Sequence, residues 1–208
     1  TAYEIPKRDW SSDVCSSDLP QMHRVVVFGT TGSGKSTLAE RLSERTGLRV
    51  IELDALYWGH EWQGAPLDLF RHRVERETRD GGWIAVGNYG QVRDLTWHAA
   101  DTLVWLDLPF ALVFWRLLKR TVRRALTREE LWGTGNRESF VRTFFTRQSI
   151  LWWAIQTHAK NRRRFEIECM FLGKDKNIAR LRSPDEVEEF ILSFWGEAEG
   201  SSVSTARC

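Results

Sequence analysis

Residues 24–42 read RVVVFGTTGSGKSTLAERL, and this stretch decides the fold of the chain. Its first part, Arg24–Phe28, is a short run of β-branched and aromatic residues, which is typical of a buried strand. The glycine-rich segment Gly29–Ser36 follows directly. Lys35–Thr46 then carries leucine and alanine at helical spacing and stops before Gly47, a residue favoured just after a helix. The stretch therefore predicts a strand and a helix joined by a tight loop.

The loop matches the pattern G-x-x-x-x-G-K-[ST], whose residue types suit the phosphates of a nucleotide. Glycines permit tight turns and carry no Cβ atoms, and successive backbone N–H groups at a helix N-terminus bind anions. We expect Lys35 to reach the β- and γ-phosphates of ATP and Ser36 to ligate Mg²⁺. The nucleotide-binding residues are expected to be Gly29, Thr30, Thr31, Gly32, Ser33, Gly34, Lys35, Ser36 and Thr37.

Short apolar runs alternate with helical segments along the rest of the chain. Four further strands are predicted, at Arg49–Leu53, Trp83–Val86, Leu103–Leu106 and Ile178–Arg182. Helices are predicted at Pro66–Arg79, at Phe110–Leu126, over most of Glu138–Arg164, and from a capping box at Ser183–Glu186 to about Phe194. Continuously apolar strands are typical of a parallel sheet buried on both faces. We expect a P-loop NTPase fold, a three-layer α/β/α arrangement with a five-stranded parallel sheet and a short helical lid.

Composition narrows the class of protein. The chain has 208 residues, of which 42% are hydrophobic and 28% charged, and these globular values exclude collagen, coiled coil and global disorder. Its three cysteines form neither a disulfide scaffold nor a zinc-ligand array. The formal net charge of +2 gives no reason to expect a nucleic-acid partner, and no segment is apolar for long enough to expect a membrane partner.

Several segments together carry a resemblance to a known family. They are GTTGSGKST, IELDALYW, WIAVGNYGQVRD, LVWLDLPFALVFWRLLKR, LTREELW with NRESF, and RLRSP. From about residue 22 to 194 the chain resembles the adenylate-kinase-like family of small P-loop kinases, and more closely the bacterial adenylate-kinase-related or topology modulation (FlaR-like) group. The resemblance implies a cytoplasmic enzyme that transfers a phosphoryl group from Mg²⁺-ATP to a nucleoside monophosphate or a similar small acceptor.

The first residues resemble something other than a protein family. Asp9–Leu19, DWSSDVCSSDL, matches the translation of a widely used short-read sequencing adapter residue for residue, and Thr1–Glu4 match the preceding part of it. We expect residues 1–21 to be a non-native or disordered leader, the alternative being a native Ser/Asp-rich tail. Residues 22–195 are then the kinase domain, with a lid at about 121–136, and residues 196–208 a flexible tail. Without residues 1–21 the charge rises from +2 to +4, because two basic and four acidic residues leave.

Acceptor-binding residues are expected after the second and third strands, at the edge of the sheet where α/β proteins bind ligands. Asp54 would hold an acceptor hydroxyl or act as general base, and its alternative role is to cap a turn. Trp58 would stack on a planar substrate or pack the surrounding lobe. Asn88 and Tyr89 end the third strand beside the acceptor. Arg93 matches by offset the arginine with which the family binds the substrate phosphate.

The metal site departs from the family pattern. At the end of the third strand the family has an aspartate that serves the Mg²⁺ shell, and here that position is Val86. Either Asp54 or Asp107 would then serve the metal, or the site has lost catalytic strength. Asp107 follows the apolar run LVWL, and we expect it to contact Mg²⁺ through water, the alternative being to cap the turn before Pro109.

A basic helix face follows Pro109. Arg116, Lys119, Arg120 and Arg123 recur on one side of the predicted helix. By their offset from Pro109, the resemblance assigns Arg116 and Arg120 to ATP, where they would stabilise charge on the transferring phosphoryl group. A solvated surface is the alternative for this face. The alternative function for the chain is a non-catalytic or slow nucleotide switch that acts on DNA or a protein partner, although no helix-turn-helix signal supports it. The sequence does not name the phosphoryl acceptor.

Overall fold

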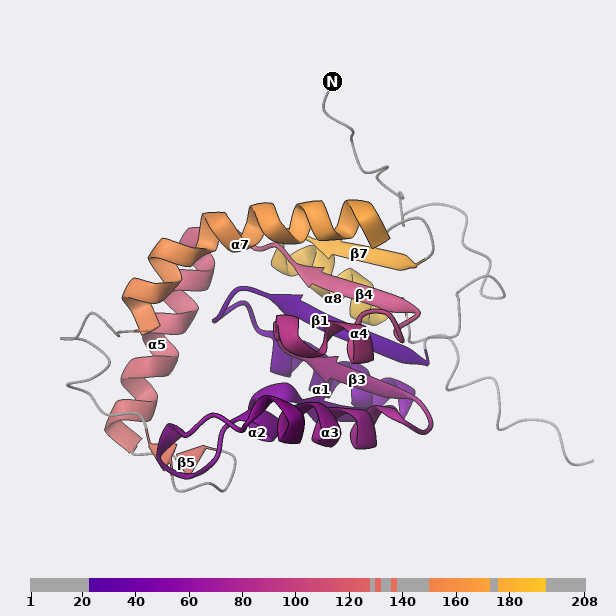
Figure 1. Cartoon of the computed structure of the whole chain (residues 1–208). Coiled ribbons are helices and arrows are strands. Elements are labelled where there is room, and N and C mark those ends of the chain that lie inside the picture. Colours follow the sequence, from indigo (N-terminus) through magenta and orange to yellow (C-terminus); the bar gives the residue numbers. More distant parts are fainter. Residues whose placement is uncertain (1–22, 128–129, 132–135, 138–149, 173–175, 194–208) are drawn as a thin grey trace, which may run out of the picture.

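The structure is a computed structural model of the chain, and it describes residues 23–127, 130–131, 136–137, 150–172 and 176–193. Five parallel strands form one sheet in the order β2-β3-β1-β4-β7 (Figure 1). The strands are β1 (Arg24–Gly29), β2 (Arg49–Glu52), β3 (Trp83–Val86), β4 (Thr102–Leu106) and β7 (Asn177–Leu181). The predicted α/β fold with a five-stranded parallel sheet is confirmed.

The central strand β1 explains why the sheet is buried on both faces. Val26 and Phe28 belong to one hydrophobic core, whereas Val25 and Val27 belong to a second core on the opposite face. All four side chains are fully buried. Because successive side chains of a strand point to opposite faces, a strand between two cores has to be apolar at every position. This is the pattern that the sequence of β1 displays.

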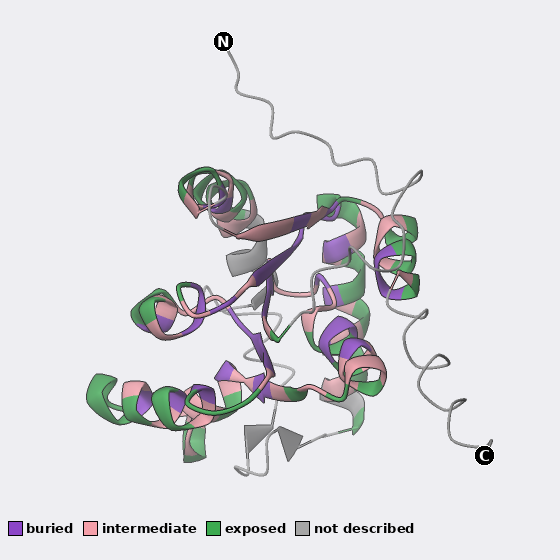
Figure 2. Ribbon diagram, turned by 90° about the vertical axis from the view of Figure 1, so that its right-hand side faces the viewer, coloured by how far each residue is buried: buried purple, intermediate pink, exposed green. Residues whose placement is uncertain are grey.

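Helices cover both faces of the sheet, and their buried sides face it (Figures 1 and 2). One layer contains α1 (Lys35–Thr46) and α8 (Pro184–Leu192). The other contains α3 (Leu67–Thr78), α4 (Arg93–Thr96) and α7 (Ile150–Leu172). Three short helices complete the connections on this side, namely α2 (Leu53–Tyr57) and the 3₁₀ turns η1 (His60–Trp62) and η2 (Gly90–Val92). The long helix α5 (Phe110–Thr127) lies at the carboxyl end of the sheet and packs against α7.

Local signals set the helix ends. Gly47 adopts the left-handed conformation with φ 70° and donates its backbone N–H to Ser43 O at 2.8 Å, as expected of a helix C-terminus. At the start of α8, Ser183 Oγ accepts a hydrogen bond from the backbone N–H of Glu186 at 3.1 Å. The Glu186 carboxylate accepts from the N–H of Arg182, one residue before the position that a standard capping box uses. The predicted N-terminal cap is therefore present with a shifted second bond.

The structure moves some predicted boundaries. Leu53 begins α2 instead of ending the second strand, and α7 continues to Leu172, beyond the predicted end at Arg164. The longer α7 follows from buried residues such as Phe165 and Cys169, which continue its contact with the sheet. Of the predicted lid, residues 121–127 are helical, whereas β5 (Glu130–Leu131) and β6 (Asn136–Arg137) pair as antiparallel strands. Residues 138–149, the predicted leader and the predicted tail lie outside the described residues.

Aromatic side chains fill the core between β1, β4 and α7. The ring of Phe28 lies 4.4 Å from that of Trp97, 6.1 Å from that of Trp105 and 5.3 Å from that of Phe165. Such tilted, stacked and edge-on arrangements add to the stability gained by burying large rings. Several of the tryptophans in the chain are thus accounted for by packing. In the part of the chain that the structure describes, no helix combines the length and hydrophobicity needed to cross a membrane.

Cys169 provides a test of this core. Burial raises the pKa of its thiol to about 12. Thiol reagents attack the thiolate, so at about pH 8 the native thiol is both protonated and covered. In a Cys15→Ser, Cys208→Ser variant, we expect Cys169 to react with a chromogenic disulfide reagent at least about 100-fold more slowly in the native state than in concentrated guanidinium. Equal rates in the two states would contradict the packing of α7 on the sheet.

Candidate functional site

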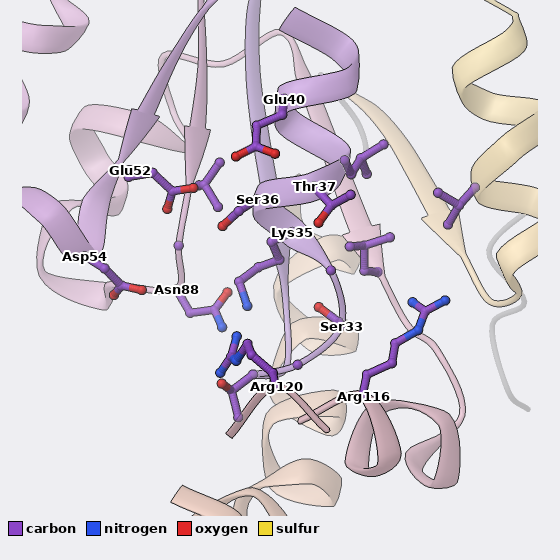
Figure 3. A pocket seen from close by; sticks show the side chains of 18 of the residues that line it. Ser33, Lys35, Ser36, Thr37, Glu40, Glu52, Asp54, Asn88, Arg116 and Arg120 are labelled. Carbon is purple, nitrogen blue, oxygen red and sulfur yellow. The ribbon is translucent and has the colours of Figure 1, made fainter. Parts of the chain in front are cut away.

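A cavity of about 1770 Å³ opens at the carboxyl ends of the strands, where the topology brings several loops together. Small-ligand sites usually occupy about 300–1,000 Å³, so this cavity has room for more than one small molecule. Its walls come from the P-loop and α1, the ends of β2 and β3, helix α5, and the start of α8. Figure 3 shows the side chains that converge on it.

The glycine-rich loop is held in one conformation by its neighbours. Gly32 has φ 81°, and a Cβ atom added there would lie 2.9 Å from Val113 O and 2.8 Å from Leu117 Cβ. Gly34 has φ 95° and precedes α1 directly. Both residues adopt a backbone that side chains rarely allow, and Gly32 also lets α5 approach the loop closely. The loop can therefore turn its N–H groups toward an anion while α5 lies against it.

Lys35 lies inside this loop, as the sequence predicts. Its Nζ donates to Thr30 O at 3.0 Å and to Gly29 O at 3.2 Å. The pKa of Lys35 is lowered to about 8, mainly by burial; the carboxylate of Asp54 opposes this shift, whereas the positive charge of Arg120 contributes to it. A lysine ammonium in this setting gains from an anion at the loop, because a phosphate would supply the charge that the neutral carbonyls lack.

Asn88 holds the start of the loop to the end of β3. Its Nδ2 donates to Gly29 O at 2.5 Å, and its Oδ1 accepts from Gly29 N–H at 3.2 Å. The side chain also lines the cavity. The sequence predicted that Asn88 touches the acceptor, and the structure adds a backbone-positioning role that the sequence did not indicate.

Glu52 is the site residue that sequence reasoning missed. It lies at the end of β2, in register with Val86 on β3, and therefore one strand away from the place where the family has its aspartate. The Ser36 hydroxyl lies beside its carboxylate (Figure 3) and acts to lower the pKa of Glu52. Burial raises the pKa of Glu52, and the neighbouring charge of Asp54 adds to the effect. The segment IELD contains two acidic residues, Glu52 and Asp54, and the sequence prediction used only Asp54.

Asp54 lines the cavity beside Glu52, at the start of α2 (Figure 3). The Tyr89 hydroxyl donates to Asp54 Oδ1 at 2.6 Å. Burial raises the pKa of Tyr89 far above its usual range, and the negative charge of Asp54 acts in the same direction. Tyr89 therefore stays a hydrogen-bond donor and fixes the carboxylate of Asp54, which leaves the second oxygen of that carboxylate for another partner.

Trp58 and Trp62 line the same part of the cavity. Their ring centroids are 5.9 Å apart at an interplanar angle of 74°. Both side chains are half-buried, in contrast to the tryptophans of the core. The structure thus brings the predicted Trp58 to the site together with Trp62.

The basic residues of α5 face the P-loop. Arg116 and Arg120 line the cavity, and in Figure 3 Arg116 points toward the side of α8, whereas Arg120 lies on the side of Lys35 and Asn88. Three more basic residues of the helix also line the cavity, namely Lys119, Arg123 and Arg124. The predicted basic face is therefore directed at the loop.

The cavity continues between α1 and α8. Thr37 and Arg41 of α1 line this end, together with apolar residues of α8, namely Pro184, Val187 and Ile191. Arg41 forms a bidentate ion pair with Glu188, with bonds of 2.5 and 2.6 Å. Apolar side chains and the ion pair between Arg41 and Glu188 thus form this end of the pocket. Such a surface suits the flat base of a nucleotide.

The structure does not bring Arg93 to the cavity. Its guanidinium forms an ion pair with Glu168 of α7 and lies over the ring of Trp97, at 4.5 Å from the centroid. Glu168 also accepts from Arg164 at 3.0 Å. The offset along the chain matched a phosphate-binding arginine, but the carboxylate of α7 binds this side chain instead. Arg93 joins two elements of the fold and does not line the pocket.

Asp107, like Arg93, forms ion pairs within the fold. Its side chain is 3% exposed, and Arg180 of β7 donates to its Oδ2 at 2.7 and 2.9 Å. Arg162 Nε lies 2.9 Å from its Oδ1. Asp107 does not line the cavity, so the prediction that it contacts the metal is not supported. Elsewhere in the described ranges, no cluster of three or more His, Cys, Asp or Glu residues that could hold a metal ion is found.

Comparisons with known proteins do not identify a family for this chain. No protein-family model matches the sequence, and no curated protein matches it. Among solved structures, a sugar kinase from Janibacter sp. HTCC2649 is 19% identical, with a TM-score of 0.47 over 85% of this chain and 95% of that one. A shikimate kinase from Bacteroides thetaiotaomicron is 14% identical, with a TM-score of 0.47 over 82% and 95%. A gluconokinase from Sinorhizobium meliloti 1021 is 19% identical, with a TM-score of 0.45 over 85% and 93%. At such values the likeness says nothing about the substrate.

Replacing Asp107 tests whether this residue stabilises the fold or takes part in binding the metal ion. Asp107→Ala leaves the mostly buried guanidinium of Arg180 with only the more exposed carboxylate of Glu166 as partner, and loss of the buried pair should cost about 3 kcal/mol of unfolding free energy. Urea denaturation measures this loss. We expect the Mg²⁺ dependence of nucleotide binding to stay unchanged. Asp94→Ala, which breaks an exposed pair with Arg71, is the control and should cost much less. A stable Asp107→Ala protein with lost Mg²⁺ dependence would restore the metal role.

Proposed function

We propose that the chain is a small-molecule kinase that transfers the γ-phosphoryl group of Mg²⁺-ATP to an acceptor hydroxyl. The observation that carries the proposal is that one cavity joins the P-loop lysine, Lys35, to the arginines of α5 on one side and to the carboxylate of Asp54 on the other. A site that only binds a nucleotide does not need the part of the cavity beside Asp54. The adenylate-kinase-like subtype and a nucleoside monophosphate acceptor remain suggestions from sequence resemblance.

The nucleotide fits the loop and the end of the pocket between α1 and α8. Backbone N–H groups at the start of α1 and the Lys35 ammonium suit the phosphates. Arg116 lies next to the loop, since its Nη1 is 3.7 Å from the place that a Gly34 Cβ would take. The apolar side chains of Pro184 and Val187 suit the base.

The residues at the end of β2 fit a magnesium ion. Mg²⁺ prefers hard oxygen ligands and is bound by one or two carboxylates together with substrate phosphates. Ser36 and Glu52 both line the cavity and supply a hydroxyl and a carboxylate next to the loop (Figure 3). We propose that these two residues hold the ion, directly or through water. When bound, Mg²⁺ offsets the negative charge of the β- and γ-phosphates.

Asp54 is the proposed general base. The acceptor hydroxyl gives its proton to the free oxygen of Asp54 while its own oxygen forms a bond to the γ-phosphorus. The bond between that phosphorus and the β–γ bridging oxygen breaks, and ADP leaves. Tyr89 acts as a positioning residue, because its 2.6 Å hydrogen bond fixes the orientation of the Asp54 carboxylate.

The arginines of α5 supply positive charge where the transferred group carries negative charge. A guanidinium pairs with two phosphate oxygens at once, which makes it suited to a phosphoryl group in transfer. Arg120 lies on the Lys35 side of the cavity and is proposed to contact the transferring group (Figure 3). Arg116 lies toward α8 and is proposed to contact the nucleotide.

No specific observation favours the alternative of a nucleotide switch. This alternative arises because Val86 occupies the position at which the family has an acidic residue. Glu52 lies in register with Val86 on the next strand and lines the cavity beside Ser36, so an acidic group is present next to the hydroxyl that is proposed to bind the metal.

Replacing Lys35 tests the proposal. We expect wild-type protein with Mg²⁺-ATP to phosphorylate at least one member of a panel of nucleosides, nucleoside monophosphates, gluconate, shikimate and other hydroxylated metabolites, detected by ³¹P NMR. Lys35→Ala should lower the rate at least about 100-fold, because it removes charge stabilisation from the transition state. Lys160→Ala, which replaces an exposed lysine of α7, should be unchanged. If wild type and Lys35→Ala are equally inert with every acceptor, the kinase proposal fails.

The metal pair has a test that does not require turnover. Calorimetry measures the affinity for a non-hydrolysable ATP analogue with and without Mg²⁺. We expect Mg²⁺ to tighten binding to the wild type and this gain to fall about tenfold in Glu52→Gln and in Ser36→Ala, because each loses one oxygen ligand. Glu44→Gln, an exposed residue on α1, is the matched control. An unchanged gain in both variants would remove Ser36 and Glu52 from the metal site.

A further inference from the structure

We propose that Asn88 is a positioning residue for phosphoryl transfer: its amide holds the carbonyl of Gly29, and through that carbonyl it places the Lys35 ammonium for the phosphates. This role rests on the kinase function proposed above and adds a residue to its nucleotide side. It differs from the sequence prediction, which assigned Asn88 to the acceptor.

The sheet topology brings Asn88 to the start of the P-loop. Strand β3 lies between β2 and β1, and Val86 at its end is in register with Val27 of β1. Gly87 N–H still donates to Val27 O, at 3.3 Å. Two residues further along each chain, Asn88 falls opposite Gly29. The ladder of main-chain pairs has ended there, and the side chain of Asn88 supplies the next pair of hydrogen bonds to β1.

The amide of Asn88 matches both polar groups of Gly29. Its Nδ2 donates to Gly29 O at 2.5 Å, and its Oδ1 accepts from Gly29 N–H at 3.2 Å. A carboxylate in this place could accept but not donate, so it would form only one of the two bonds. Because the amide binds the residue at both its N–H and its carbonyl, it fixes the orientation of Gly29 as a whole.

Gly29 requires such a restraint. A Cβ atom there would lie 2.7 Å from Leu106 O of β4, and its φ is 150°, so the close approach of β4 demands glycine. Glycine is also the residue whose backbone turns most easily. The loop therefore begins with its most flexible kind of residue, and bonds from the neighbouring strand hold that residue in one orientation.

Lys35 depends on the same carbonyl. Its Nζ donates to Gly29 O at 3.2 Å and to Thr30 O at 3.0 Å. A carbonyl oxygen has two lone pairs, so Gly29 O can accept from Asn88 and Lys35 together (Figure 3). An ammonium has three donors, so two can hold it to the loop while the third binds a phosphate oxygen. Rotation of the Gly29 carbonyl would therefore displace the positive charge.

The end of β3 also holds the acceptor side. Tyr89 follows Asn88 directly, and its hydroxyl donates to Asp54 Oδ1 at 2.6 Å. Because β3 lies between β1 and β2, two consecutive residues at its end reach the loop after each neighbour. One short segment thus fixes Lys35, through Gly29, and the proposed base Asp54. Phosphoryl transfer requires such a fixed separation between the phosphate-binding group and the base.

A double-mutant cycle tests whether Asn88 acts through Lys35. Calorimetry on the full chain measures the affinity for a non-hydrolysable ATP analogue with Mg²⁺ in the wild type, Asn88→Ala, Lys35→Ala and the double variant. We expect Asn88→Ala to weaken binding roughly tenfold when Lys35 is present and less than about twofold when Lys35 is replaced. A residue that only supported the fold would weaken binding equally in both backgrounds.

Two further variants guard the cycle. Gln91→Ala removes an exposed amide from η2, in the same segment of the chain, and should bind the analogue as the wild type does. Asn88→Leu keeps the approximate size of the side chain without its polar groups. It gives a second cycle with Lys35→Ala in which no space is left empty, and we expect the same dependence on Lys35.

Turnover gives an independent result. With an acceptor that the wild type phosphorylates, Asn88→Ala should lower kcat roughly tenfold at saturating ATP, because a displaced ammonium stabilises the transferring group less well. The KM for the acceptor should stay within about twofold of the wild type. If Asn88 binds the acceptor instead, its replacement raises the acceptor KM and leaves the affinity for the ATP analogue unchanged.

The outcomes separate this role from the proposed function. If the ATP analogue does not bind the wild type, binds Lys35→Ala equally well, or no acceptor is phosphorylated, the kinase proposal fails and the role of Asn88 fails with it. If the kinase proposal stands, any one of three results overturns the role alone: an equal loss of affinity in both backgrounds, an unchanged kcat, or an effect confined to the acceptor KM.

Discussion

The close approach of the P-loop to α5 is the contact on which the site depends. At Gly32 the space of a side chain is already occupied by the carbonyl of Val113 and the Cβ of Leu117. Any other residue there would push α5 away, and with it the arginines one helical turn further on. The loop is also fixed from the other side, because Asn88 binds the backbone of Gly29 through both ends of its amide. The loop is thus placed by α5 and β3 before a nucleotide arrives.

Charge divides the cavity into two parts. Basic residues of α5 surround the P-loop, whereas Glu52 and Asp54 stand at the end of β2. The two signs meet near Lys35, whose pKa burial lowers while Asp54 and Glu52 oppose the shift. A phosphoryl group in transfer needs positive charge on its oxygens and a base at the attacking hydroxyl, and this division provides the two on opposite sides. Neither half would be useful without the loop between them.

The sequence predicts well what depends on neighbours in the chain. The P-loop, the fully apolar strands and the end of α1 at Gly47 are local signals, and all of them are found in the structure. Arg93 and Asp107 lie outside the cavity, bound to Glu168 and Arg180, which are more than seventy positions away, and no spacing rule shows that these residues meet. Glu52 was missed for the same reason: its closeness to Ser36 comes from strand order and not from the local sequence.

Among the described tryptophans, those of the core and those of the cavity differ in their optical surroundings. Trp83, Trp97 and Trp105 are enclosed in the core, in a surrounding that water cannot reach. Trp58 and Trp62 share their environment with whatever occupies the cavity. Indole emission moves to longer wavelength with water contact and is quenched by a stacked ring. The chain therefore carries its own fluorescent labels, one set that reports unfolding and another that reports occupancy of the cavity beside Trp58 and Trp62.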